Sequence, residues 1–201
     1  NIKEILLFAG GLSQLFKKII KETFHGKIYW KLVSEQLTII GWRSLPLIII
    51  TAISTGMVMS LQYGLGLEKF GGKLYVPKLV AITILREMGP VFTALMIAAR
   101  VGAGIASEIG SMTVTQQIDA IRALGTSPIK VIVIPRVLAC LIALPLLVAL
   151  ANLVGNAGGL WVGHSELKLD ANFYFQKVIT TVDFYDYLSG IFKTFFFAMF
   201  I

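Results

Sequence analysis

The sequence predicts an all-α polytopic membrane protein. Of its 201 residues, 56% are hydrophobic and 14% are charged, and its mean hydropathy of +0.80 exceeds that of an average soluble domain. Three apolar runs each reach the roughly 20 residues that a helix needs to cross about 30 Å of hydrocarbon. A short polar, amphipathic stretch separates the second run from the third. We therefore expect membrane-spanning helices with one surface helix between spans two and three.

Residues 1–40 are expected to form an amphipathic helical segment in the membrane interface. Apolar residues recur there at spacings of three and four, with polar residues between them, as on one face of a helix. They are Ile2, Ile5, Leu6, Ala9, Leu12, Phe16, Ile19 and Ile20. Packing of this face on the other spans is the alternative.

Positive charge before the first span predicts a cytoplasmic N-terminus. Much of the net charge of +7 lies in Lys3, Lys17, Lys18, Lys21, Lys27, Lys31 and Arg43. This orientation places the stretch 108–130 inside and the acidic stretch 166–186 outside. Because the charge flanks a span, membrane orientation explains it and nucleic-acid binding is not expected.

Three complete spans are expected at residues 45–65, 79–109 and 129–162, within a transmembrane domain that covers residues 41–201. A fourth apolar run begins near Tyr187 and holds about 15 residues up to Ile201, fewer than a crossing requires. We expect the chain to end inside this helix, before the last helices of the domain.

Each complete span carries small residues at every fourth position, which lets helix backbones approach closely in lipid. These ladders are Ala52, Gly56, Ser60 and Gly64; Ala98, Gly102, Ala106 and Gly110; and Ala151, Gly155, Gly159 and Gly163. They predict tight packing of the helices on one another or on a second copy of the chain. The general abundance of Gly and Ala in membrane helices is the alternative explanation.

Charged residues within the spans are expected to face protein or water, because a charge near the bilayer centre costs about 2.5–3.5 kcal/mol or more. Glu87 and Glu108 are 21 residues apart and are expected to mark the two ends of the second span. Arg100 then lies inside the membrane, where it either lines a substrate path or pairs or snorkels to the surface. Asn152 and Asn156 either hydrogen-bond across helices or line a cavity.

Arg86 and Glu87 precede Gly89 and Pro90, a pair that can loosen a helix and free backbone groups for other partners. Adjacent side chains on a helix point about 100° apart, so we expect Arg86 and Glu87 to have separate partners. Lys193, in the fourth apolar run, is one candidate partner for Glu87.

The polar stretch between spans two and three predicts a helix of about three turns. Thr113 or Thr115 is its candidate N-cap, and Gly125 is its expected end. The expected apolar face consists of Val114, Ile118, Ile121 and Leu124, while Gln116, Asp119 and Arg122 point elsewhere. Such a helix suits a groove on a soluble partner. A loop helix resting on lipid is the alternative.

Neither an enzyme site nor a resident cofactor is expected in this chain. Gly26-Lys27 and Gly72-Lys73 are each followed by an apolar residue, so neither completes the phosphate-binding loop G-x-x-x-x-G-K-[ST]. His25 and His164 are far apart in the sequence, and Cys140 is the single cysteine. If transport is driven by ATP, the ATP and Mg²⁺ must bind to another polypeptide.

Several motifs resemble the MlaE, or YrbE-type, permeases of ABC lipid transporters associated with MCE proteins. The matching motifs are Gly56-Met57-Val58 with Leu61-Gln62, Leu85-Arg86-Glu87-Met88-Gly89-Pro90, Ala99-Arg100-Val101-Gly102, Ala106-Ser107-Glu108-Ile109-Gly110, Thr115-Gln116-Gln117-Ile118-Asp119-Ala120, and Ser127-Pro128 leading to Pro135-Arg136. Their order and spacing agree over roughly residues 41–201, whereas residues 1–40 match only in kind.

The resemblance implies a homodimeric, non-enzymatic permease that moves phospholipid or related lipid between its membrane and an MCE-protein shuttle, in support of outer-membrane lipid homeostasis. It implies a cytoplasmic ABC ATPase, an MCE ring and, in many cases, a STAS-domain subunit as partners. The membrane would be the bacterial inner membrane or, alternatively, the plastid inner envelope.

The resemblance also assigns roles to particular residues. The stretch from Thr115 to Leu124 is similar to the ATPase-coupling helix, with Thr115, Gln116, Gln117, Ile118, Asp119, Ile121, Arg122 and Leu124 as its contact residues. The intramembrane charges near the lipid path would be Arg86, Glu87, Arg100, Glu108 and Lys193. Gln116 stands where many relatives carry Glu, so a hydrogen bond would replace a salt bridge to the ATPase.

Two other function classes remain open from the residues alone. An ion-coupled secondary transporter could use Glu87 and Arg100 as a relay, but it would need inverted repeats, and the sequence shows no matching halves. A non-transporting membrane scaffold would explain the small-residue ladders but would leave the charges within the spans without a role.

Overall fold

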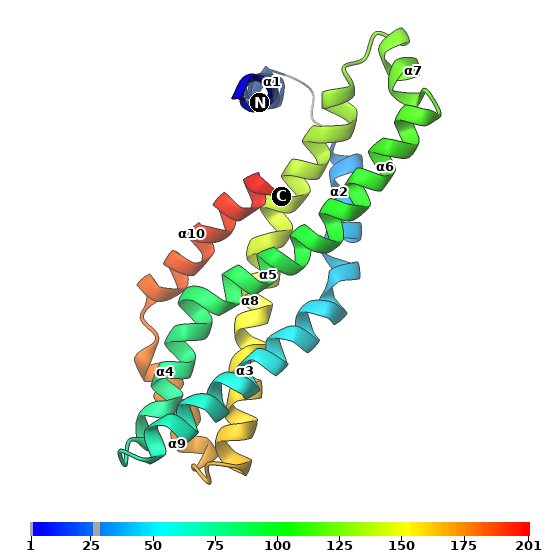
Figure 1. Ribbon diagram of the computed structural model, residues 1–201. Coiled ribbons are helices and arrows are strands. Elements are labelled where there is room, and N and C mark those ends of the chain that lie inside the picture. Colours follow the sequence, from blue (N-terminus) through cyan, green and yellow to red (C-terminus); the bar gives the residue numbers. More distant parts are fainter. Residues whose placement is uncertain (1, 26–28) are drawn as a thin grey trace.

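The computed structural model describes residues 2–25 and 29–201, and the described residues are helices and their connections (Figure 1). The helices are α1 (Ile2–His25), α2 (Trp30–Ile40), α3 (Leu45–Glu68), α4 (Val76–Thr83), α5 (Gly89–Ile97), α6 (Ala103–Val114), α7 (Gln117–Ala123), α8 (Ile134–Ser165), α9 (Ala171–Thr181) and α10 (Phe184–Phe200). Three helical stretches among them are long and apolar enough to cross a membrane: Trp30–Glu68, Lys73–Val114 and Ile129–Ser165. The three predicted apolar runs are therefore present as long helices that are candidate membrane spans, and each helical stretch is longer than expected.

The N-terminal segment is divided into two helices that differ in their surroundings. Helix α2 packs on α8 through its buried Val33 and Ile40, and a short 3-10 turn, Trp42–Ser44, joins it to α3. Residues 30–40 thus extend the first spanning stretch, where the sequence predicted an interfacial segment. The break in the helix falls at Gly41.

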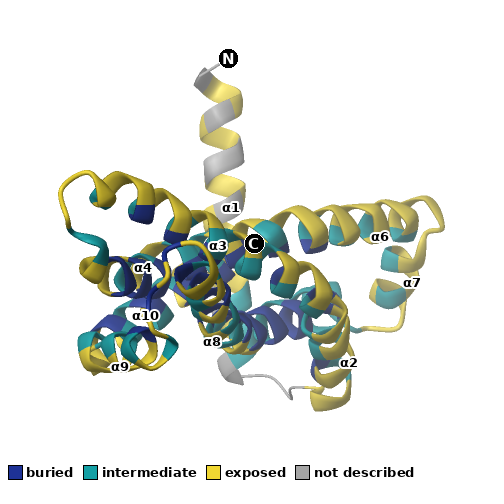
Figure 2. Ribbon diagram, turned by 90° about the horizontal axis from the view of Figure 1, so that it is seen from below, coloured by how far each residue is buried: buried dark blue, intermediate teal, exposed yellow. Residues whose placement is uncertain are grey.

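Helix α1 projects away from the helix bundle and lies at the same end of the molecule as α7 (Figures 1 and 2). It is joined to the segment before α8 by Ser127, whose Oγ donates a hydrogen bond to Glu22 Oε1 at 3.0 Å. Leu6 of the predicted apolar face is exposed. The side chains of Ile2, Ile5, Ala9, Leu12, Phe16 and Ile20, predicted for the same face, lie outside the described residues. The interfacial position of α1 stays a prediction.

The second spanning stretch is one long helix interrupted by two wide π-helical turns. Helices α4, α5 and α6 follow one another through the turns Ile84–Met88 and Ala98–Gly102. The stretch begins at Lys73, so about 20 Å of helix precedes Glu87. Glu87 therefore lies inside this helix and does not mark its end. Its charge is matched by a side chain of another helix, described below.

The core lies where α8 meets the other helices. One cluster of buried side chains joins α8 to α2, α3, α5 and α10, with Ile48, Ile97 and Leu144 at its centre. A second cluster lies at the opposite end from α7, where Val80 of α4 packs against Tyr174 of α9. Burial raises the pKa of Tyr174 to about 12. Helix α8 is therefore the central element, with α9 closing one end.

Helix α9 was not predicted, because its 11 residues contain no long apolar run. Asp170 caps it by accepting a hydrogen bond from the Asn172 backbone amide. Helix α10 begins at Phe184, three residues before the expected start, because Asp183 and Asp186 form a capping box. The fourth apolar run is thus helical from Tyr187 to Phe200.

Candidate functional site

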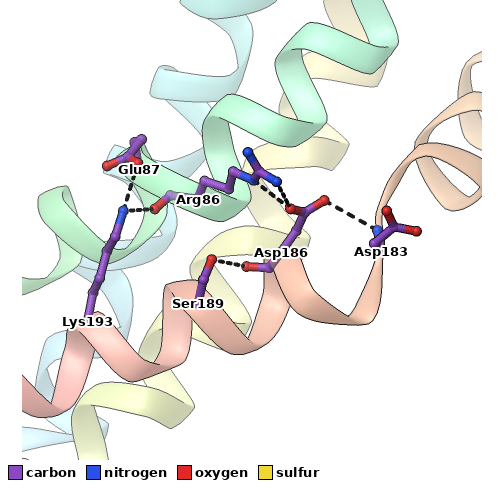
Figure 3. Close-up of polar contacts among 6 residues, drawn as sticks. All are labelled: Arg86, Glu87, Asp183, Asp186, Ser189 and Lys193. Carbon is purple, nitrogen blue, oxygen red and sulfur yellow. Dashed lines mark hydrogen bonds and ion pairs between the residues drawn. The ribbon is translucent and has the colours of Figure 1, made fainter.

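Two ion pairs join the second spanning stretch to α10 (Figure 3). Arg86 bonds to Asp186, with its Nε donating to Oδ1 at 2.5 Å, and its Nη2 also contacts this oxygen. Lys193 Nζ lies 2.7 Å from Glu87 Oε1. Arg86 and Glu87 therefore have separate partners, as predicted, and the predicted pairing of Glu87 with Lys193 is confirmed.

The local backbone explains why these charges meet. Pro90 has no N–H, so it cannot donate the usual helical hydrogen bond to the carbonyl oxygen of Arg86, four residues earlier. Lys193 Nζ donates to that oxygen at 3.1 Å (Figure 3). Gly190 allows α10 to come this close, because a Cβ there would lie 2.5 Å from the Leu85 carbonyl oxygen. The wide turn and the proline thus present the Glu87 carboxylate and the Arg86 carbonyl oxygen to Lys193.

Arg86, Glu87, Asp186 and Lys193 form a charge cluster, and Asp186 is the member that the sequence analysis missed. Its place in an acidic stretch suggested an outer loop, whereas its side chain is buried against Arg86. The sequence carried one signal that could have led to Asp186, namely that Arg86 was expected to need a partner of its own. The side chains of Arg86, Glu87 and Lys193 remain about half exposed, so the cluster presents both charge signs on the surface of the helices.

Arg100 lies in the second π-helical turn and bonds to a hydroxyl group. Its Nη1 donates to Ser44 Oγ at 2.5 Å, and Ser44 is buried in the turn between α2 and α3. The sequence analysis expected Arg100 to line a substrate path, to pair or to reach the surface, and the structure gives it a serine hydroxyl as its partner. Within the described residues, no carboxylate forms an ion pair with Arg100, so this contact leaves the charge of the guanidinium unneutralised.

Glu108 forms an ion pair with Arg136, the residue that ends the last of the matching motifs. Arg136 Nη2 lies 2.6 Å from Glu108 Oε1, and Nη1 donates to the Ile132 carbonyl oxygen at 3.3 Å. The Arg136 side chain is buried, while that of Glu108 is half exposed. This pair joins α6 to α8 and shares no residue with the charge cluster.

Removing the Glu108 carboxylate is expected to destabilise the fold by about 1–3 kcal/mol, because it leaves the buried Arg136 guanidinium without its anion. The variant Glu108→Ala should lower the midpoint of thermal unfolding in detergent. The double variant Glu108→Ala/Arg136→Met should recover most of the loss, since an apolar side chain replaces the buried charge. Equal stability of wild type and Glu108→Ala would contradict this role of the pair.

The small-residue ladders pack unequally. Gly56 of α3 lies against Gly155 of α8, and a Cβ on Gly56 would overlap the Gly155 carbonyl oxygen. Gly159 faces Tyr174, and Gly64 faces Leu167. Ladders one and three therefore pack within the chain, which is one of the two arrangements that the sequence left open. At Gly102 and Gly110 of the second ladder, an added Cβ would meet nothing within 4 Å, so this ladder does not pack tightly within the described chain.

The polar stretch forms a shorter helix than expected. Helix α7 covers Gln117–Ala123, and Gln116 precedes it in a left-handed conformation with φ 55°. The hydroxyls of Thr113 and Thr115 donate back to carbonyl oxygens four residues earlier in α6, so the prediction that one of them caps α7 is wrong. Gly125, with φ 73°, follows the helix as predicted.

Helix α7 forms a tip at the end of α6, away from the helix bundle (Figure 1). Val114 and Leu124 are 85% and 82% exposed, while Ile118 and Ile121 are partly buried. Arg122 Nη1 lies 3.1 Å from Asp119 Oδ1 on the exposed side of the helix. Exposed apolar groups beside charged ones suit a contact with a soluble protein, and this tip is continuous with the helix that carries Arg86 and Glu87.

Comparison with known proteins identifies the family to which this chain belongs. Residues 33–201 match the model of a protein family described as Permease MlaE. The chain belongs to the MlaE permease family. As an ABC transporter permease subunit, it is a non-catalytic transport component, as predicted, and a permease of this class works with an ATPase.

Relatives of this permease occur in bacteria and in a plant. A probable ABC transporter permease protein of Rickettsia typhi is 37% identical over 184 residues, which cover 91% of this chain and 71% of that protein. The intermembrane phospholipid transport system permease protein MlaE of Haemophilus influenzae is 33% identical, covering 85% and 66%. The chloroplastic protein TRIGALACTOSYLDIACYLGLYCEROL 1 of Arabidopsis thaliana is 28% identical, covering 88% and 51%.

Proposed function

We propose that this permease is the membrane subunit of an ATP-driven transporter that moves phospholipid or a related lipid between its membrane and an MCE-protein shuttle. One observation carries the proposal. A single helical stretch, Lys73–Val114, holds Arg86 and Glu87 in its apolar part and leads directly into the exposed tip formed by α7. A partner that moves α7 can therefore move the charge cluster through one helix. The name of the Haemophilus relative supports phospholipid as the cargo.

The partners follow from the same proposal. A cytoplasmic ATPase that binds ATP and Mg²⁺ contacts the tip formed by α7. Its contact residues are Thr115, Gln116, Gln117, Ile118, Asp119, Ile121, Arg122 and Leu124. A second copy of the permease, an MCE ring on the opposite side of the membrane and a STAS-domain subunit complete the complex. The N-terminus is cytoplasmic, in a bacterial inner membrane or a plastid inner envelope, and the transporter contributes to outer-membrane lipid homeostasis.

The contacts of the intramembrane charges argue against a proton or ion relay between Glu87 and Arg100. Glu87 bonds to Lys193 of α10, whereas Arg100 bonds to Ser44 between α2 and α3. The two groups thus have different partners on different helices. A scaffold without transport would not need a half-exposed cluster of both charge signs in the apolar part of the molecule.

The proposal is tested by ATP-dependent lipid transfer. The full-length permease, its ATPase and its MCE partner are placed in liposomes that contain a fluorescent phospholipid, and transfer to acceptor liposomes is followed over time. We expect transfer only with hydrolysable ATP, and a loss of at least tenfold in Lys193→Met. Transfer that ignores ATP and follows an imposed ion gradient would overturn the proposal in favour of a secondary transporter.

A further inference from the structure

A cavity of about 780 Å³ lies between α1, the end of α7 and the segment that leads into α8, and basic side chains line it from all three. Lys18 and Lys21 belong to α1, Arg122 belongs to α7, and Lys130 belongs to the first turn of the stretch Ile129–Ser165. Among the described residues, no carboxylate forms an ion pair with any of these three lysines. Like charges that gather in one place repel each other, so a bound anion would stabilise this arrangement.

The cavity lies where two candidate membrane spans begin. Tyr29 lines it and directly precedes the stretch Trp30–Glu68, and Lys130 is the second residue of the stretch Ile129–Ser165. Tyr29 and Trp30 are exposed, as aromatic side chains at the level of the lipid headgroups are. Helix α1 runs across the direction of the spans, because it is seen end-on in Figure 1 and along its length in Figure 2. If α1 lies along the membrane surface, as predicted, the cavity is at the level of the headgroups.

The basic lining suits a phosphate group. Ammonium and guanidinium groups both bind phosphate, and basic pockets on the cytoplasmic side of membrane proteins bind phospholipid headgroups. The predicted orientation places α7 and this cavity on that side. Arg122 also pairs with Asp119 on the exposed side of α7, so the three lysines carry the charge that is free to bind a ligand.

Glu22 adds a hydrogen-bond acceptor to the lining. Its Oε1 accepts a hydrogen bond from Ser127 Oγ at 3.0 Å, which fixes the carboxylate in place. Its Oε2 is buried and has no hydrogen-bond partner among the described residues. A buried acceptor is costly unless a donor reaches it. A headgroup that carries hydroxyl groups beside its phosphate would supply this donor as well as the anion for the lysines.

We propose that this cavity binds the headgroup of an anionic phospholipid with free hydroxyl groups, such as phosphatidylglycerol, from the leaflet on the α7 side of the membrane. The phosphate lies against Lys18, Lys21 and Lys130, and a headgroup hydroxyl donates to Glu22. The lipid is a bound ligand and is not transported from this site. Because it contacts α1, α7 and the start of α8 together, it holds α1 against the exposed tip.

The site is tested by native mass spectrometry of the full-length permease in an uncharged detergent. The protein is titrated with phosphatidylglycerol or with the zwitterionic lipid phosphatidylcholine. We expect phosphatidylglycerol to bind more tightly. The variant Lys18→Gln/Lys21→Gln/Lys130→Gln should weaken its apparent affinity by about tenfold or more, because each lysine near the membrane surface attracts anionic lipid.

The variant Lys3→Gln/Lys17→Gln/Lys31→Gln is the matched control. It removes the same charge from the N-terminal part of the chain and from the start of α2, and its three lysines are exposed and do not line the cavity. We expect it to bind phosphatidylglycerol as wild type does. Arg122 is left unchanged in both variants, because the proposed ATPase contact includes it.

Unchanged affinity in the folded Lys18→Gln/Lys21→Gln/Lys130→Gln variant would overturn the proposal. An equal loss in the control variant would also overturn it, because general surface charge would then attract the lipid. If the cavity variant does not fold, Lys18→Gln/Lys21→Gln replaces it, since both side chains are exposed. Phosphatidylethanol has the same headgroup charge without a hydroxyl and should bind more weakly than phosphatidylglycerol. Equal binding of the two would overturn the contact with Glu22.

Two further measurements distinguish other ligands of the same lysines. Phosphatidylglycerol should raise the midpoint of thermal unfolding of wild type more than inorganic phosphate at matched ionic strength does. Equal stabilisation by inorganic phosphate, lost in the cavity variant, would show a site for free phosphate and overturn the headgroup. A cavity variant that keeps its lipid affinity but no longer co-purifies with the ATPase would show that the lysines contact that protein. The binding experiment contains no ATPase, ATP or MCE protein, so its outcome is independent of the proposed function.

Discussion

The variant Gly56→Ala should be severely destabilised, although it adds only one methyl group. The added Cβ would overlap the Gly155 carbonyl oxygen and lie 2.7 Å from its carbonyl carbon. Both atoms belong to the backbone of α8, so no side chain can rotate away and the two central helices must separate. Overpacking of a core costs about 1–3 kcal/mol, and a clash between two backbones belongs at the upper end of that range or beyond it.

The measurement is the yield of monodisperse protein and its midpoint of thermal unfolding in detergent. Gly102→Ala is the matched control, because the same methyl group there meets nothing within 4 Å and alanine favours a helix. We expect Gly102→Ala to be as stable as wild type or slightly more stable. If Gly56→Ala behaved like Gly102→Ala, the close contact between α3 and α8 would be wrong.

Replacing Asp186 should impair both stability and transport. Its carboxylate is the anion that faces Arg86, and it also takes part in the capping box of α10. In Asp186→Ala, the guanidinium loses its partner and α10 loses part of its cap. Because Arg86 is half exposed, water compensates in part, and we expect a loss of about 2–4 kcal/mol, somewhat less than the effect of breaking a fully buried pair.

A double variant separates the structural role of this pair from its functional role. Arg86→Met/Asp186→Leu removes both charges and should be more stable than Asp186→Ala, because no unpaired charge remains. If the charges of Arg86 and Asp186 take part in lipid transfer, transfer should stay low in the double variant even where thermal stability is recovered. Recovery of transfer together with stability would show that the pair only holds the helices in place.

The sequence predicted those features that depend on local pattern. Long apolar runs gave three spans, and the spacing of glycines indicated that the helices containing Gly56 and Gly155 could approach closely. The predicted spans were shorter than the helical stretches of the structure, because a helix can continue beyond its apolar run. The second stretch, for example, begins at Lys73, before the predicted start at residue 79. Helix α9 was missed because a short helix with mixed polarity resembles a loop when only hydropathy is considered.

The partners of charged residues were harder to predict than the charges themselves. Lys193 was found as a partner for Glu87 because a lysine in an apolar run is conspicuous. Asp186 was overlooked because it lies among other acidic residues, and Ser44 because a serine before a span carries no sign of an arginine partner. The choice between these partners depends on the relative positions of helices that are far apart in the sequence.

The central claim, that α7 couples this permease to an ATPase, is tested most directly by co-purification of the full-length complex. The variant Ile118→Glu/Ile121→Glu places two charges on the predicted apolar face of α7. Ala120→Glu/Ala123→Glu places the same charges on the opposite face, because residues on a helix are 100° apart. Gel filtration and thermal unfolding show whether each permease still folds. We predict that the ATPase is lost from the first variant and retained by the second and by wild type. Retention of the ATPase by a folded Ile118→Glu/Ile121→Glu variant would contradict the account.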